Sequence, residues 1–99
     1  MVKHIVMWKL KDEIKQDGSE ALVASLQERF KALLGVVPGL TEIEFGANYN
    51  GGEYDIVLYC AFQTRADQDA YQSNPAHLAV AETVRASTCG RACVDYEIE

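Results

Sequence analysis

The spacing of apolar residues changes along the chain in an order that few folds can accommodate. Three segments alternate in apolar character and a fourth is apolar nearly throughout, which are two patterns typical of strands, while two regions repeat every three to four residues, as amphipathic helices do. The strand segments are 2–10, 40–47, 54–62 and 91–98, and the helical regions are 19–35 and 64–84. The order strand, helix, strand, strand, helix, strand predicts an α+β fold, in which helices cover one face of a four-stranded antiparallel sheet.

Turn and cap residues separate these segments. Ser19 is placed to cap the first helix, and Pro38-Gly39 turns the chain after that helix ends near Gly35. Thr64, with Asp67 three residues later, predicts a helix start, and Asn74-Pro75 predicts a second one as N-cap and first helical residue. The second helical region is therefore expected to consist of two short helices.

Length and charge limit the classes of function. The 99 residues suit one domain, residues 1–99, and the net charge of −6 with scattered basic residues argues against a nucleic-acid partner. No segment reaches the roughly 20 apolar residues of a membrane span, so we expect no membrane partner and a cytoplasmic location. Cys60, Cys89 and Cys93 form no CxxC pair, which favours reduced thiols.

The third strand predicts self-association. Because segment 54–62 is apolar on both faces, it should lie in the centre of the sheet. The helices can cover only one face, and we expect the face with Ile56, Leu58 and Phe62 to lack a cover within the chain. Two such faces packed together form a closed barrel between subunits, so the sequence predicts a homodimer, with a trimer or larger ring as the alternative.

Several short motifs, spread over the whole chain, carry a family resemblance. They are Val2-Lys3-His4-Ile5-Val6, Lys9-Leu10-Lys11-Asp12-Glu13, Val37-Pro38-Gly39-Leu40, Tyr54-Asp55-Ile56-Val57, Tyr71-Gln72-Ser73-Asn74-Pro75-Ala76-His77 and Val94-Asp95-Tyr96. The chain resembles the stress-responsive A/B-barrel domain family, also called Dabb. The resemblance implies a ferredoxin-like subunit in a dimeric α+β barrel, and one plant branch of the family consists of polyketide cyclases that work without a cofactor.

Three residues are the candidate catalytic groups. His77 falls in the first turn of a helix, where the positive end of the helix dipole favours a neutral imidazole that can act as a base. The resemblance places Tyr71 and His4 with it on the wall of one pocket, where the phenol could donate to a carbonyl oxygen that gains negative charge. The alternatives are a structural histidine at the sheet end for His4, a polar first-turn residue for His77 and a core aromatic residue for Tyr71.

Two positions depart from the cyclase-like members of the family. Phe30 stands where those members have a tyrosine, and Asp55 stands where they have a histidine. A phenylalanine cannot donate a hydrogen bond, so the cyclisation of the plant enzymes is not expected here. Asp55 is either a carboxylate that orients His4 or His77, or a polar residue at a strand end.

The metal and cofactor predictions are narrow. Some plant relatives hold a cation with main-chain carbonyls near the Pro-Gly turn, which here would be those of Leu34, Val37 and Leu40, and carbonyl oxygens suit Mg²⁺ or Ca²⁺. Cys89, Cys93 and His77 fall one ligand short of a usual zinc site. No GxGxxG turn follows a strand, so we expect no haem, flavin or nicotinamide cofactor.

Three functional hypotheses remain open. The first is a dimer that binds a small carbonyl or phenolic molecule, with cofactor-free acid-base chemistry of the cyclase or lyase kind. The second is a non-catalytic stress-associated or assembly protein. The third is a cofactor-free monooxygenase, which shares the barrel but is signalled by no motif of this chain.

Overall fold

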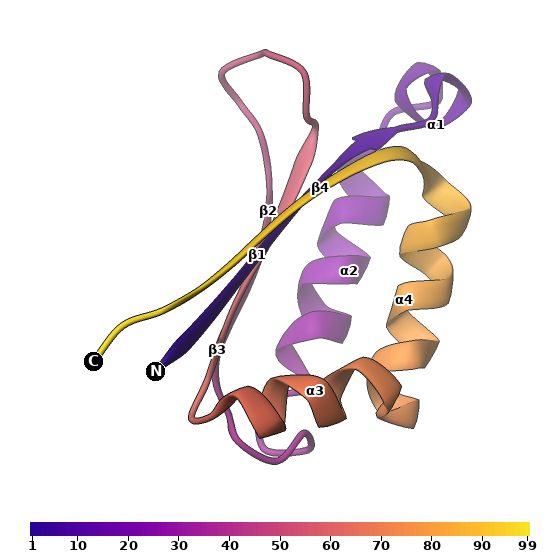
Figure 1. Ribbon diagram of the computed structural model, residues 1–99. Helices are drawn as coiled ribbons and strands as arrows, with labels where there is room; N and C mark the ends of the chain where they lie inside the picture. The colour runs from indigo at the N-terminus through magenta and orange to yellow at the C-terminus, as the bar shows by residue number, and fades with distance from the viewer.

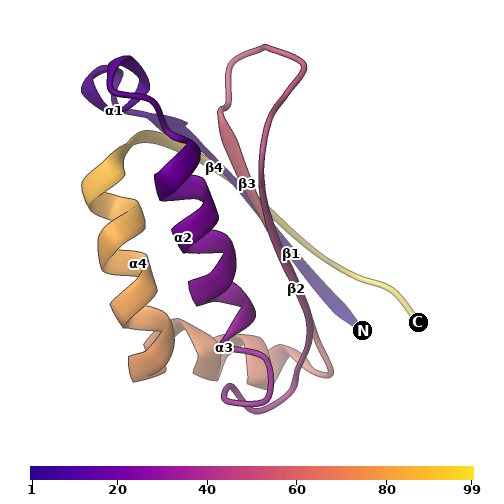
Figure 2. The same ribbon diagram turned by 180° about the vertical axis from the view of Figure 1, so that it is seen from behind.

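The computed structural model describes all residues 1–99 and consists of two layers, a twisted sheet and a layer of helices on one side of it (Figure 1). The elements in chain order are β1 (Val2–Leu10), α1 (Asp12–Gln16), α2 (Glu20–Lys31), β2 (Leu40–Ala47), β3 (Ile56–Phe62), α3 (Arg65–Ser73), α4 (Pro75–Ser87) and β4 (Thr88–Glu97). The strand order in the sheet is β2-β3-β1-β4, and every neighbouring pair is antiparallel. The reverse view shows α2 and α4 side by side against the sheet, with α3 crossing below them (Figure 2). None of the helices is both long and apolar enough to cross a membrane.

The predicted elements are present, with differences at their ends. The third strand begins at Ile56 and the last at Thr88, two residues later and three residues earlier than the alternating patterns indicated. The five-residue helix α1 was not predicted, because the polar stretch that forms it buries no residue and so shows no hydrophobic period. Ser19 is the N-cap residue of α2, as predicted, but its side chain makes no capping hydrogen bond.

The two caps after β3 are confirmed. The Thr64 hydroxyl accepts a hydrogen bond from the main-chain N–H of Asp67 at 3.1 Å, and the Asn74 side chain accepts one from the N–H of Ala76 at 2.9 Å. The Thr64 hydroxyl also donates a hydrogen bond to the Asp67 carboxylate at 2.9 Å; in the usual capping box the acidic side chain instead accepts from the main-chain N–H of the N-cap residue. Asn74 ends α3 and begins α4, and this fixes the position of the first turn of α4.

The core lies between the sheet and the helices. Leu26 and Phe30 of α2 pack there, and the rings of Phe30 and Phe45 stack with centroids 5.1 Å apart. Ile56, Leu58 and Phe62 are 2%, 2% and 0% exposed, so the prediction that their face lacks a cover was wrong. When both faces of a strand are apolar, alternation separates the faces but cannot tell which of them the helices will cover.

The other side of the sheet, which we call the open face, carries the opposite set of side chains. Strand register places Ile5 beside Val94, and Met7 beside Val57. Val94 is 56% exposed and Tyr96 is 44% exposed. The sequence therefore correctly predicted that one apolar sheet face has no cover within the chain. It placed that face on the Ile56, Leu58 and Phe62 side of β3, which is the side that the helices cover.

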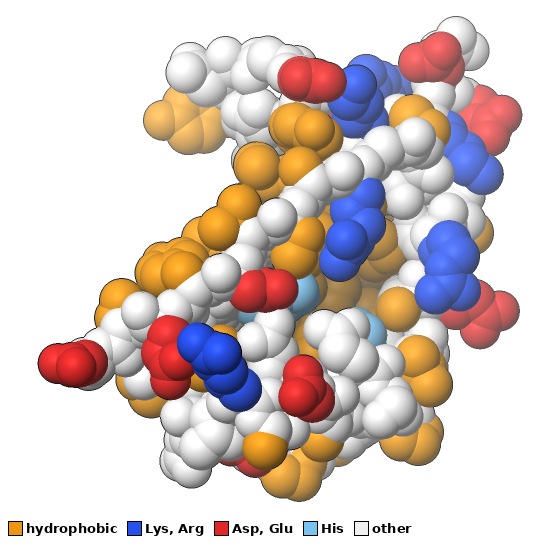
Figure 3. All heavy atoms as spheres, viewed as in Figure 1, with side chains coloured by type: hydrophobic (Ala, Val, Ile, Leu, Met, Phe, Trp, Pro, Cys, Tyr) orange, Lys and Arg blue, Asp and Glu red, His pale blue; other side chains and the backbone are white.

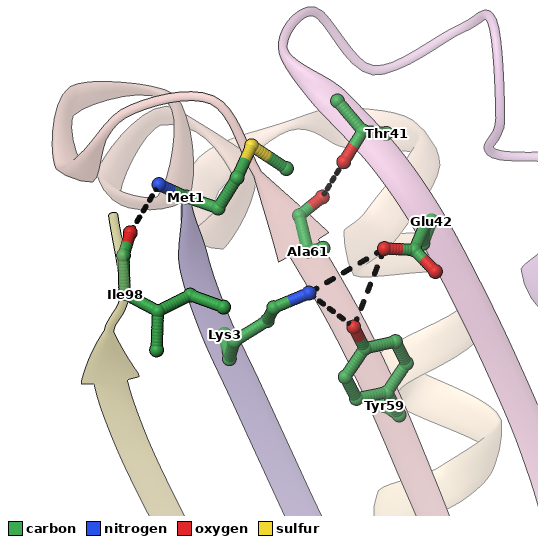
Figure 4. Close-up of polar contacts among 7 residues, drawn as sticks. All are labelled: Met1, Lys3, Thr41, Glu42, Tyr59, Ala61 and Ile98. Atoms are coloured by element: carbon green, nitrogen blue, oxygen red, sulfur yellow. Dashed lines mark hydrogen bonds and ion pairs between the residues drawn. The ribbon is translucent and has the colours of Figure 1, made fainter.

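One end of the open face is polar (Figure 4). The Lys3 ammonium donates to the Tyr59 hydroxyl at 2.6 Å and to the Glu42 carboxylate at 3.4 Å. The hydrogen bond with Tyr59 and the charge of Glu42 both raise the pKa of Lys3. Thr41 lies at a register shift between β2 and β3, and its hydroxyl donates to the Ala61 carbonyl at 3.1 Å.

Candidate functional site

His4 is held by a carboxylate from the neighbouring strand. Antiparallel pairing places His4 of β1 opposite Asp95 of β4, and Nδ1 of the imidazole lies 2.5 Å from Oδ1 of the carboxylate. Burial raises the pKa of Asp95, but the hydrogen bond and the charge of His4 outweigh burial and leave that pKa below its ordinary value. His4 itself is only 4% exposed. The carboxylate fixes the orientation of the ring and directs its other nitrogen, Nε2, away from Asp95.

His77 lies in the first turn of α4 and packs against Tyr71 of α3. The two ring centroids are 3.9 Å apart, and the Tyr71 ring also meets His4 edge to face at 6.3 Å. The structure thus brings the three predicted residues together, with the Tyr71 ring against both imidazoles. The break at Asn74 makes this possible, because it lets two helices of different direction meet at this point.

The surroundings of His77 favour its neutral form. Burial lowers its pKa, and the nearby charge of His4 adds to that effect, whereas the main-chain carbonyls of Gln72 and Tyr71 oppose it. Its Nδ1 is buried and has no hydrogen-bond partner, since neither carbonyl meets the geometry of a hydrogen bond. The nitrogen that remains available to a ligand is Nε2.

The Tyr71 hydroxyl faces the core. Tyr71 is 1% exposed and its hydroxyl makes no hydrogen bond. The nearby Cys60 thiol does not meet the geometry of a hydrogen bond, and burial raises the pKa of that thiol to about 12 and also raises the pKa of Tyr71. Tyr71 therefore stays protonated, and its ring supports both imidazoles from behind.

A cavity of about 450 Å³ lies in front of the two imidazoles, between α4 and the strands β1 and β4. His4 and His77 line it, together with apolar side chains that include Val6, Trp8 and Leu58; Tyr71 does not line it. In the space-filling view the histidine side chains are visible in a hollow that is open to solvent (Figure 3). This volume falls within the range of about 300–1,000 Å³ that is usual for small-molecule sites.

Asp55 lies outside this group. Its carboxylate accepts a hydrogen bond from the main-chain N–H of Leu10 at 2.8 Å and lies 3.5 Å from the Lys15 ammonium. Its main-chain N–H bonds to the Trp8 carbonyl, whereas His4 pairs with Cys60 farther along β3. The structure therefore supports the second reading of Asp55, a polar residue that ties α1 to the end of the sheet, and the carboxylate that orients His4 is Asp95.

Two sets of groups could hold a cation. Around the Pro-Gly turn, the Val37 carbonyl accepts a hydrogen bond from the N–H of Leu40 at 3.3 Å. A Mg²⁺ or Ca²⁺ site formed by the main-chain carbonyls of Leu34, Val37 and Leu40 stays a prediction. In the candidate site, ligand atoms of His4, Cys93 and Asp95 lie within 4.8 Å of one another. The hydrogen bond between His4 and Asp95 already accounts for the position of these two groups.

The prediction from sequence missed Asp95 as a site residue, although the sequence holds a signal for it. Strands 2–10 and 91–98 were both predicted, and an antiparallel pairing that matches their ends places Asp95 near His4. The pattern of a single segment does not show which strands are neighbours. The adjacency of β1 and β4 supplies the missing step.

Comparison with known proteins agrees with this architecture. The model of the Stress responsive A/B Barrel Domain family, Dabb, matches residues 2–98. The chain belongs to the Dabb family. No curated protein matches the sequence of this Dabb domain.

Three solved structures illustrate how this Dabb domain relates to known folds. A dimeric protein of unknown function with a ferredoxin-like fold from Bacteroides fragilis is 36% identical, with a TM-score of 0.87 over 98% of this chain and 95% of that chain. Hydroxynitrile lyase from Passiflora edulis is 17% identical, with a TM-score of 0.79 over 99% and 93%. An antibiotic biosynthesis monooxygenase is 16% identical, with a TM-score of 0.72 over 100% and 99%. The last two similarities show the ferredoxin-like fold alone.

Proposed function

We propose that this Dabb domain binds a small carbonyl or phenolic molecule in the cavity in front of His4 and His77 and promotes proton transfer on it without a cofactor. The observation that carries the proposal is the pair of imidazoles that line one cavity: burial lowers the pKa of His77, and His4 is bonded to a carboxylate. A ligand-sized apolar space with a few convergent polar groups is the usual form of a small-molecule site. The similarity to the lyase and the monooxygenase is one of fold, so neither activity is transferred.

The two imidazoles have complementary roles in this chemistry. Nε2 of the neutral His77 takes a proton from the carbon beside the ligand carbonyl, so that a C–H bond breaks, an N–H bond forms and the electron pair moves to the carbonyl oxygen. This step requires the imidazolium form of His4, which is held by Asp95 through Nδ1 and donates its Nε2–H to that oxygen as it becomes negative. Tyr71 packs behind both rings and keeps His77 in place. The product is an enolate, which is the intermediate common to aldol-type cyclisation and its reverse.

The domain acts as a homodimer in this proposal. The open face presents Ile5, Met7, Val57, Val94 and Tyr96 to solvent in an isolated subunit. Covering this face with a second copy buries apolar surface and closes a barrel between the two sheets. The relative from Bacteroides fragilis, 36% identical over nearly the whole chain, is described as dimeric. The site itself lies on the other side of the sheet, within one subunit.

The experiment is heteronuclear NMR mapping with a small panel of phenols and β-diketones that includes acetylacetone. We expect chemical-shift changes at His4, His77 and the apolar cavity residues, together with deuterium exchange at the central carbon of acetylacetone above the buffer rate. His77→Ala should remove the exchange and weaken binding. Glu82→Ala is the matched control, because Glu82 is exposed on the same helix and does not line the cavity.

The outcomes separate the competing functions. Binding without exchange would reduce the proposal to a ligand-binding role. Shifts that miss the cavity, or a His77→Ala variant that behaves as the unaltered protein does, would overturn the proposal and favour the non-catalytic assembly protein. Consumption of oxygen with a phenol would favour the monooxygenase instead.

A further inference from the structure

One end of the cavity carries two arginines that form no ion pair. Arg85 of α4 and Arg91 of β4 both line the cavity, and no carboxylate does. Neither guanidinium takes part in an ion pair, although the chain has a net charge of −6 and other basic residues, such as Arg65, are paired. Basic side chains flank the opening of the hollow in the space-filling view (Figure 3).

Two different elements bring these arginines to the same end. Arg85 follows His77 by eight residues on α4, which is slightly more than two turns, so the two side chains share one face of the helix. Arg91 lies four residues from Asp95 along β4, and Asp95 pairs with His4. Arg85 is thus displaced along α4 from His77, and Arg91 is displaced along β4 from the position opposite His4.

The helix dipole explains only one of the two arginines. A cation in the last turn of a helix is stabilised by the carbonyl end of the dipole, which suits Arg85. Arg91 lies on a strand and gains nothing from this effect. Both arginines are exposed and line the cavity, so what they share is their approach to a ligand in it.

We infer that Arg85 and Arg91 form a subsite for the carboxylate of an elongated carbonyl compound whose reacting end lies at His4 and His77. This inference rests on the proposed function and specifies its substrate class. Val6, Trp8 and Leu58 line the cavity as well, and they suit an apolar chain or ring between the two ends. Guanidinium groups bind carboxylates with paired, charge-assisted hydrogen bonds, which makes arginine suited to this role.

The spacing sets the length of the ligand. Eight residues of helix correspond to a rise of about 12 Å, and the Arg85 side chain leans back toward the N-terminus by several ångströms, so the two ends are roughly 6–12 Å apart. An extended chain advances roughly 1.2 Å per covalent bond, so about five to ten bonds separate the carboxylate from the reacting carbonyl. A keto acid such as 7-oxooctanoate meets this requirement.

The experiment compares 7-oxooctanoate with the neutral 7-oxooctanamide, which has the same length, by calorimetric titration at low and moderate salt. We expect the acid to bind about tenfold more tightly than the amide, and Arg85→Gln and Arg91→Gln each to reduce acid binding about five- to tenfold without changing amide binding. Arg65→Gln is the matched control, because it removes the same charge from a residue outside the cavity, and it should leave both affinities unchanged.

Each result has a distinct meaning. Equal affinities for acid and amide, or an acid preference that survives both substitutions, would overturn the arginine subsite while leaving the proposed function intact if both ligands still shift His4 and His77. If neither ligand perturbs the two histidines, the proposed function fails together with the subsite. A circular dichroism spectrum of each variant confirms that it is folded, and Arg91→Lys offers a second variant that keeps the charge but loses the paired geometry.

Discussion

The two faces of the sheet make opposite predictions for substitutions on them. Leu58 lies on β3 in the core, and Val94 lies on β4 on the open face. Leu58→Ala should destabilise the subunit itself, whereas Val94→Asp should leave the subunit folded and prevent it from pairing. The two variants together test which face the helices cover and which face a second copy covers.

The magnitude for Leu58 follows from its burial. It is 2% exposed and belongs to the central apolar cluster, so removal of its branched end leaves a cavity and should cost about 2–5 kcal/mol. For a domain of this size each kcal/mol corresponds to a shift of about 4–8 °C in Tm, so a loss of about 3 kcal/mol lowers Tm by roughly 12–24 °C. Val94 is 56% exposed in one subunit, and an Asp there should change the stability of that subunit by less than about 0.5 kcal/mol.

The assay is urea unfolding at two protein concentrations, combined with light scattering at the higher one. Because a dimer stabilises its folded subunits by mass action, the unaltered protein should unfold at higher urea when it is more concentrated. Leu58→Ala should lower the midpoint at both concentrations, and Val94→Asp should scatter as a monomer and lose the concentration dependence. A Leu58→Ala loss below about 1 kcal/mol, or a Val94→Asp variant that remains dimeric, would refute the assignment of the faces.

Three further results are expected. Thr64→Ala should lower the free energy of unfolding by about 1 kcal/mol in urea titrations, because it removes the cap of α3, and no loss would contradict that role. Gly39→Ala should cost more than about 1 kcal/mol in the same assay, since Gly39 has a φ of +79° and an added Cβ would meet the Asp67 carboxylate; an unchanged midpoint would refute this reasoning. Stability should fall as the pH drops below about 6.5, because unfolded His77 binds a proton that the folded state disfavours; His77→Gln should flatten this part of the curve, and an unchanged slope would refute the lowered pKa.

Much of the fold could be predicted from local chemistry. The alternating segments, the Pro38-Gly39 turn and the caps at Thr64 and Asn74 each report on their own neighbourhood, and the structure contains all of them. The face that the helices cover could not be predicted in this way. Both faces of β3 are apolar, and only the packing of Leu26 and Phe30 from α2 determines which face becomes the core.

The candidate site was predictable only in part, for the same reason. His4, Tyr71 and His77 were named together on the strength of a resemblance, and the ring contacts among them bear out their proximity. Asp55 was offered as a carboxylate that orients His4 or His77, or else as a polar residue at a strand end, and Asp95 was not named, because the partner of His4 depends on which strands are neighbours. Strand adjacency is a long-range property that the pattern of a single segment does not contain.

The most direct test of the account uses the fact that the chain has only two histidines. With ¹⁵N-labelled histidine, long-range NMR spectra report the protonation and tautomer of each ring nitrogen without overlap. At pH 7 the account predicts a neutral His77 and a proton on Nδ1 of His4 toward Asp95, and acetylacetone should move the Nε2 signals of both rings. A charged His77 at pH 7, or ring signals that do not move while the ligand binds, would contradict it.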